Sequence, residues 1–101
     1  MPLTGAVVFK AVLQRENRVQ VPRLLRWQYR MESDQVLSVE VRNVESFGTE
    51  RFLGRMMRDG RLTIPKLTLR LLQGGEESSL VGAVLEVTVE PAEERGEKLN
   101  P

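Results

Sequence analysis

The chain contains no cysteine and no histidine. Without cysteine it can form neither a disulfide framework nor a zinc–thiolate site. Without histidine it lacks the usual general base, the commonest metal ligand and every catalytic triad that needs an imidazole. Its adjacent carboxylates, Glu76/Glu77 and Glu93/Glu94, stand in polar segments, away from the apolar surroundings that favour acid catalysis. We therefore expect a non-enzymatic protein with no catalytic residue, no metal and no cofactor.

Long apolar runs are also missing. The longest, such as GAVV, are far too short to span a membrane, and the first residues lack the basic region and apolar segment of a signal peptide. The 101 residues, 41% of them hydrophobic and 29% charged, are typical of one soluble domain with a modest core. We therefore expect a cytoplasmic monomer with no membrane association.

Acidic residues are scarce in most of the chain, although the net charge is only +1. Residues 10–72 carry 13 Lys/Arg and 7 Asp/Glu, whereas residues 73–101 carry 2 and 7. Twelve of the 15 cations are arginine, whose guanidinium can bind phosphates and base edges with two parallel hydrogen bonds. The basic region is therefore a candidate for binding an anionic partner, although an arginine excess also follows from genome composition or a thermophilic source.

The basic region contains an internal repeat at an offset of 43 positions. Residues 15–25 read RENRVQVPRLL, and residues 58–68 read RDGRLTIPKLT. The repeat begins earlier, because VVFKAVLQ and RFLGRMM both place a large, a small and a large residue on one face. After the helix the second copy is delayed by five residues, through QGGEESSLVGA, before its last strand AVLEVTVE matches QVLSVEVR. The chain is therefore a duplication of one unit of about 40 residues.

Each copy predicts two strands, a short helix and a third strand. A polar turn separates the first two strands, with Asn17 and Gly60 where a hairpin needs a positive φ. Pro22 and Pro65 end the second strands and suit the first turn of the helices PRLLRWQYRM and PKLTLRLLQ. The residues predicted to face inward are Phe9, Ala11, Leu13, Val19, Val21, Leu25, Tyr29, Leu37, Val39 and Val41, then Phe52, Gly54, Met56, Leu62, Ile64, Leu69, Leu72, Leu85, Val87 and Val89.

One copy alone would leave a sheet face and two edges uncovered. Two copies related by a pseudo-twofold axis can bury both apolar faces and remove the edges. We therefore expect a mostly β fold: a closed six-stranded barrel built from residues 7–44 and 50–90, with two short helices. The domain is predicted to span residues 1–92. The segment 93–101, EERGEKLNP, has almost no apolar residue, so we expect a disordered acidic tail.

The repeated motif resembles the element shared by the AbrB/SpoVT transition-state regulators and the wider cradle-loop barrels. Its usual form is Gly-Arg-apolar-x-apolar-Pro-Lys/Arg-x-apolar-Arg-x-x-Leu. The stretch NRVQVPRLLRWQY fits with Asn for Gly and Tyr for the last Leu, and GRLTIPKLTLRLL fits with its helix arginine one place late. A three-strand unit duplicated within one chain is similar to the single-chain RIFT and double-psi barrels of that superfamily. We favour the RIFT type and a thermophilic archaeal source.

This resemblance implies that basic residues of the motif approach DNA. The positions that match, or nearly match, the strand, post-proline and helix bases of the motif are Arg18, Arg26, Arg61, Arg70, Arg23 and Lys66. The alternative is structural, with these arginines capping strand ends and pairing with Glu40, Glu45 or Asp59. Tyr29 is interpreted as a packing residue. Trp27 is also interpreted as packing, with contact to a protein or a nucleic acid left open.

Two functions follow. The first is a nucleic-acid-binding relative of the AbrB-type regulators, in which an arginine surface contacts DNA. The second is a protein-binding or adaptor module that uses an apolar groove near Trp27. An arginine surface free of carboxylates would favour the first function, and an apolar groove would favour the second.

Overall fold

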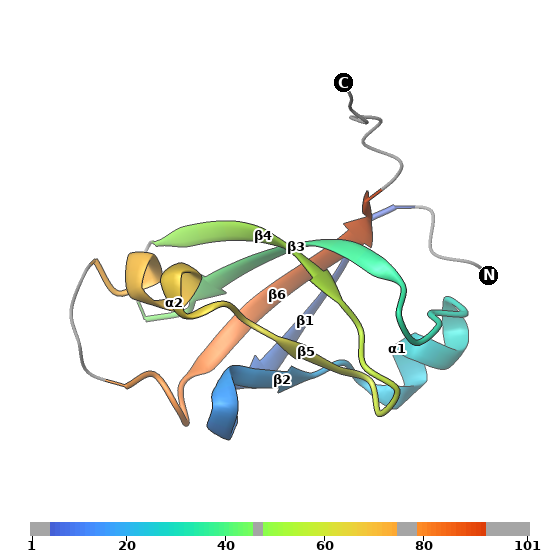
Figure 1. The fold of residues 1–101 in the computed structure, drawn as a ribbon, viewed down its shortest axis with the longest axis horizontal. Coiled ribbons are helices and arrows are strands. Elements are labelled where there is room, and N and C mark those ends of the chain that lie inside the picture. The colour runs from blue at the N-terminus through green and yellow to red at the C-terminus, as the bar shows by residue number, and fades with distance from the viewer. Residues whose placement is uncertain (1–4, 46–47, 75–78, 93–101) are drawn as a thin grey trace.

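The computed structural model describes residues 5–45, 48–74 and 79–92. These residues form six strands, two α-helices and one short 3-10 helix, arranged as two layers with the helices at the ends (Figure 1). In chain order the elements are β1 (Val7–Val12), η1 (Arg15–Asn17), β2 (Arg18–Gln20), α1 (Arg23–Gln28), β3 (Val36–Asn43), β4 (Thr49–Arg55), β5 (Arg61–Thr63), α2 (Lys66–Leu72) and β6 (Val84–Pro91). The predicted order of strand, strand, helix and strand is therefore confirmed in both repeats. The predicted tail, 93–101, lies outside the described residues.

Each pair of hydrogen-bonded strands joins one strand of the first repeat to one strand of the second. An antiparallel sheet has the order β1-β6-β3-β4, so the first strand of each repeat pairs with the third strand of the other. Val7 lies opposite Val89 in β6. Shifting these residues by the two repeat offsets gives Glu50 opposite Val41, which is the observed pairing of β4 with β3. The duplication is therefore reproduced in the hydrogen-bond register as well as in the element order.

The predicted closed barrel is wrong. The six strands form two separate sheets, one of four strands and one made of β2 and β5. The strands β2 and β5 have three residues each, and each is followed by an apolar residue and a proline that has no N–H for a ladder. They are therefore too short to link β1 with β4. The expected hairpin between β1 and β2 is also absent beyond the single bridge Gln14–Arg18, because β2 takes β5 as its partner.

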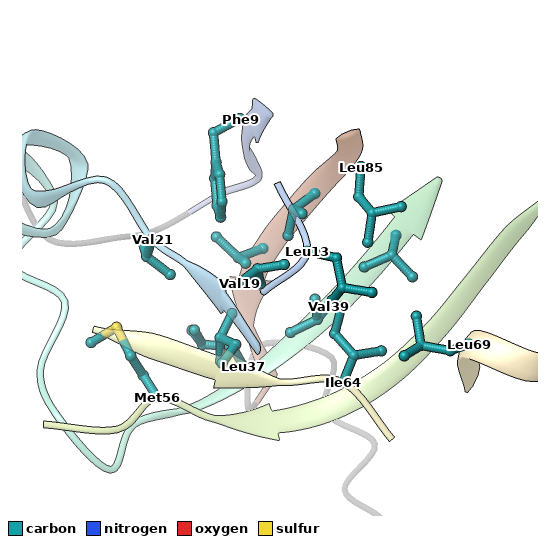
Figure 2. Packing of buried hydrophobic residues seen from close by; sticks show 14 of the residues in the cluster. Phe9, Leu13, Val19, Val21, Leu37, Val39, Met56, Ile64, Leu69 and Leu85 are labelled. Carbon is teal, nitrogen blue, oxygen red and sulfur yellow. The ribbon is translucent and has the colours of Figure 1, made fainter. Parts of the chain in front are cut away.

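The core lies between the two sheets and contains residues from both repeats. The inward residues of β2, β3, β5 and β6, and the residues that directly follow β2 and β5, were predicted correctly. The completely buried ones are Val19, Val21, Leu37, Val39, Val41, Leu62, Ile64, Leu85, Val87 and Val89. In Figure 2, Val19 of β2, Val39 of β3, Leu13 directly after β1 and Ile64 directly after β5 gather in one cluster. Burial of one side chain of this size stabilises the fold by about 1.5–3 kcal/mol. Neither repeat can supply this core alone.

The turns before β2 and β5 have the backbone that the sequence predicts. Asn17 has a φ of 60° and Gly60 a φ of 85°. The Val21 N–H donates to the Gly60 carbonyl at 2.9 Å, and the Ile64 N–H donates to the Asn17 carbonyl at 2.7 Å. Each turn therefore contacts the segment that leads into the helix of the other repeat. No helix within the described residues is long and apolar enough to cross a membrane.

Candidate nucleic-acid interface

The six predicted DNA-contacting residues do not gather on one surface. Arg23 and Arg26 belong to α1, which lies at the opposite end of the molecule from α2 (Figure 1). Lys66 and Arg70 belong to α2. The remaining two arginines are on β2 and β5, which cross between the helices (Figure 1). The structure therefore divides the predicted set into two helix ends and a central pair of strands.

The two strand arginines are held by carboxylates of the turns that precede them. Arg18 Nη2 lies 3.0 Å from Glu16 Oε1. Arg61 Nε lies 3.7 Å from Asp59 Oδ2 and donates to Gln20 Oε1 at 3.4 Å. The predicted pairing of an arginine with Asp59 is therefore confirmed for Arg61. A guanidinium already paired with a carboxylate gains less from a phosphate than a free one does, so this central pair is a weak candidate for the interface.

The predicted partner Glu40 contacts an arginine outside the predicted set. Its Oε1 accepts a hydrogen bond from Arg51 Nη2 at 2.7 Å. Nη1 of the same arginine lies 3.9 Å from Glu90 Oε2. These residues lie on three neighbouring strands of the larger sheet. Glu40 and Glu90 thus pair with an arginine of the same sheet and not with the arginines of the helices.

Arg26 attaches α1 to the turn before β5. Its Nε donates to the Val21 carbonyl at 3.2 Å, and its guanidinium lies against Gly60, where a Cβ would overlap it. Gly60 is buried and also accepts the hydrogen bond from the Val21 N–H. Glycine at this position therefore serves both the positive φ and the close approach of the guanidinium. We conclude that Arg26 positions α1 against the turn before β5.

An open concavity lies along α1, lined in part by Arg23, Arg26, Trp27 and Arg30. Trp27 is 79% exposed, so its interpretation as a packing residue is wrong. Tyr29 packs against the core, as predicted. Arg23 and Arg30 are exposed, and neither forms an ion pair with a described residue. Glu32 is the one carboxylate among the lining residues. We call the exposed side chains of Arg23, Trp27 and Arg30 the α1 surface.

Arg30 was not predicted from the sequence, and its backbone is unusual. It has a φ of 51°, a left-handed conformation that favours glycine. Its N–H donates to the Trp27 carbonyl at 3.3 Å, and the Met31 N–H donates to the Arg26 carbonyl at 2.9 Å. These two bonds form a Schellman motif in which Arg30 is the C′ residue. The C′ residue after α2, a helix one residue longer, is Gly74, with a φ of 73°. At the repeat offset of 43 Arg30 aligns with Gln73, so the sequence repeat gave no signal for it.

The α2 end of the molecule has a different surface. Leu69 takes the position of Arg26 and is only 7% exposed, so no arginine attaches this helix to the neighbouring turn. Lys66 and Arg70 are exposed without an ion pair to a described residue, beside the exposed Leu67 and Leu71. No aromatic side chain stands on this helix. The roles predicted for Lys66 and Arg70 stay predictions.

No family model and no curated protein matches this chain. A solved structure does resemble it: the solution structure of PHS018 from Pyrococcus horikoshii, with a TM-score of 0.66. The two chains are 24% identical, and the match covers 90% of this chain and 94% of that one. This likeness shows the fold, which is therefore shared with a small protein from an archaeon.

Proposed function

We propose that this chain is a non-enzymatic protein that binds nucleic acid through the α1 surface. The observation that carries the proposal is the exposure of Arg23 and Arg30 on either side of Trp27, with neither guanidinium paired to a described carboxylate. Unpaired guanidinium groups can bind phosphate oxygens and release condensed counterions. The resemblance of both motifs to the AbrB-type regulators makes DNA the first ligand to test.

The test is a titration of the protein with duplex and single-stranded DNA at several salt concentrations. Each phosphate contact contributes roughly 0.7–0.9 to the slope of log affinity against log salt. The double variant Arg23→Ala/Arg30→Ala is expected to lower that slope by about 1.4–1.8. Both side chains are exposed, so the variant should keep a near-native melting temperature.

Two matched variants control for the loss of charge. Lys66→Ala/Arg70→Ala removes the same two charges from the α2 end, and Arg18→Ala/Arg61→Ala removes them from the central strands. Both are expected to change the slope less than the α1 variant does. Equal effects of all three variants would show a diffuse electrostatic attraction and would overturn the assignment to α1. Absence of binding by the unmodified protein even at low salt would overturn the nucleic-acid proposal itself.

A protein partner is the second candidate function. Leu24 is 74% exposed and stands three positions before Trp27, so the two side chains lie on one face of α1. Exposed apolar side chains that lie together often mark protein-binding surfaces. This function would be favoured if the protein binds no nucleic acid at low salt, and if substitution of Leu24 and Trp27 abolishes its binding to a protein partner.

A further inference from the structure

Trp27 has no structural task that accounts for its position. It is the single tryptophan of the chain and is 79% exposed on a helix of six residues. None of the residues of α1 is buried, so the helix does not need the indole to reach the core. The nearby Tyr29 does pack against the core. An indole that is left in solvent while a neighbouring ring is packed is available to stack on a ligand.

The indole has arginine side chains beside it, and the positions of two of them, Arg26 and Arg30, are set by the backbone around them. Arg26 is fixed by its hydrogen bond to the Val21 carbonyl and by its contact with Gly60. Arg30 keeps a left-handed backbone at the C′ position of its helix, which in α2 is occupied by Gly74. Such a conformation costs about 1–2 kcal/mol for a residue with a Cβ. A side chain retained at that cost beside an exposed ring points to a contact that glycine cannot make.

We infer that the α1 surface takes an unpaired nucleobase, which stacks on Trp27 while the flanking phosphates bind Arg23 and Arg30. This inference rests on the proposed function and names its substrate class. In a duplex the faces of the bases are covered by their neighbours, so an indole at the protein surface can stack only on a base that has left the stack. Single-stranded DNA or RNA therefore binds this surface more tightly than a duplex of the same length and charge.

The emission of Trp27 tests the inference directly, because no other tryptophan contributes to it. The probes are an oligothymidine of about ten nucleotides, a duplex of equal length and inorganic polyphosphate, which has charge but no base. Oligothymidine is expected to quench the emission and to bind most tightly. By anisotropy of a labelled oligonucleotide, Trp27→Leu is expected to weaken oligothymidine binding by about 5- to 150-fold and duplex binding far less. Trp27→Phe keeps a ring and should retain part of the affinity.

Leu24→Ala is the matched control, because Leu24 is the other large apolar side chain exposed on α1 and carries no ring to stack. It should leave oligothymidine affinity within about twofold of the unmodified protein. A loss as large as that of Trp27→Leu would indicate a general apolar contact and overturn stacking. Equal affinity for the duplex or polyphosphate, with unchanged emission, would also overturn stacking. Duplex binding with the predicted salt slope would still leave the proposed function standing. No binding of any nucleic acid at low salt would overturn both.

Discussion

The helices α1 and α2 occupy equivalent places in the two repeats, but their side chains are used differently. Thr68, Leu69 and Leu72 of α2 are buried, whereas α1 has no buried residue. α1 is attached by the polar contact of Arg26 with Val21 and Gly60 and by the half-buried Leu25, which packs against the core. The fold therefore uses α2 as part of its core and leaves α1 as a platform. The difference between the equivalent residues Arg26 and Leu69 therefore shows that the two helices are attached in different ways.

The largest difference is expected at the position shared by Arg26 and Leu69. Leu69→Ala should lower the free energy of unfolding by about 2–4 kcal/mol, because it leaves a cavity beside the core. Arg26→Ala should lower it by only about 0.5–1.5 kcal/mol, the usual contribution of one hydrogen bond. Urea denaturation followed by circular dichroism measures both. Similar losses would show that α1 is anchored as firmly as α2.

A smaller difference is expected between the two turns. Gly60→Ala should destabilise the protein by about 1–2 kcal/mol, because alanine is strained at a φ of 85° and its Cβ would overlap Arg26. Asn17→Gly, at the equivalent place, should leave the stability unchanged or raise it slightly. The double variant Gly60→Ala/Arg26→Ala separates the two causes in the same denaturation assay. If the double variant is as stable as Arg26→Ala alone, the loss in Gly60→Ala comes from the overlap with the guanidinium. If the double variant is less stable than Arg26→Ala by the full loss of Gly60→Ala, the loss comes from the strained backbone.

The two helix C-termini are predicted to respond in opposite directions. Arg30→Gly should raise the free energy of unfolding by up to about 1 kcal/mol, because glycine relieves the left-handed backbone. Gly74→Ala should lower it by about 1 kcal/mol. If Arg30 contacts a ligand, Arg30→Gly should weaken nucleic-acid binding while it stabilises the fold. Arg30→Ala keeps the strain and removes the charge, so it should weaken binding without the gain in melting temperature.

The smallest effects are expected for the paired arginines of β2 and β5. Their ion pairs with Glu16 and Asp59 are partly exposed, and such pairs contribute about 0–1 kcal/mol. Arg18→Ala and Arg61→Ala should therefore each change the melting temperature by only a few degrees. The two changes should also be similar, because the surroundings of the two arginines are related by the duplication. A large loss for one of them would break that equivalence.

Much of the local structure could be predicted from the sequence. Alternation in the third strands predicted the buried triplet that begins at Leu37 and the one that begins at Leu85, because a strand with one buried face has a period of two. Asn17 and Gly60 predicted positive φ, because few other residues accept it readily. Pro22 predicted the end of one strand and the start of a helix, because its ring fixes φ and removes a hydrogen-bond donor.

The pairing partners and the site could not be predicted in the same way. That β2 pairs with β5 depends on residues more than 40 positions apart, and the alternation within a strand does not specify its partner. The left-handed backbone of Arg30 depends on where α1 ends, which a sequence pattern locates only to within a few residues. The exposure of Trp27 depends on how deeply α1 packs. These properties arise from tertiary contacts that the motif alone does not contain.

The exchange of strands between the repeats has a consequence for synthesis in the cell. β1 is made before its partner β6, which ends at Pro91, so most of the domain is synthesised between the two paired strands. Until then the apolar side chains of β1 have neither their neighbouring strand nor their core. Folding of the domain must therefore wait until β6 has left the ribosome, and contacts of such long range slow it. The nascent first repeat would be the stage at which a chaperone is most useful.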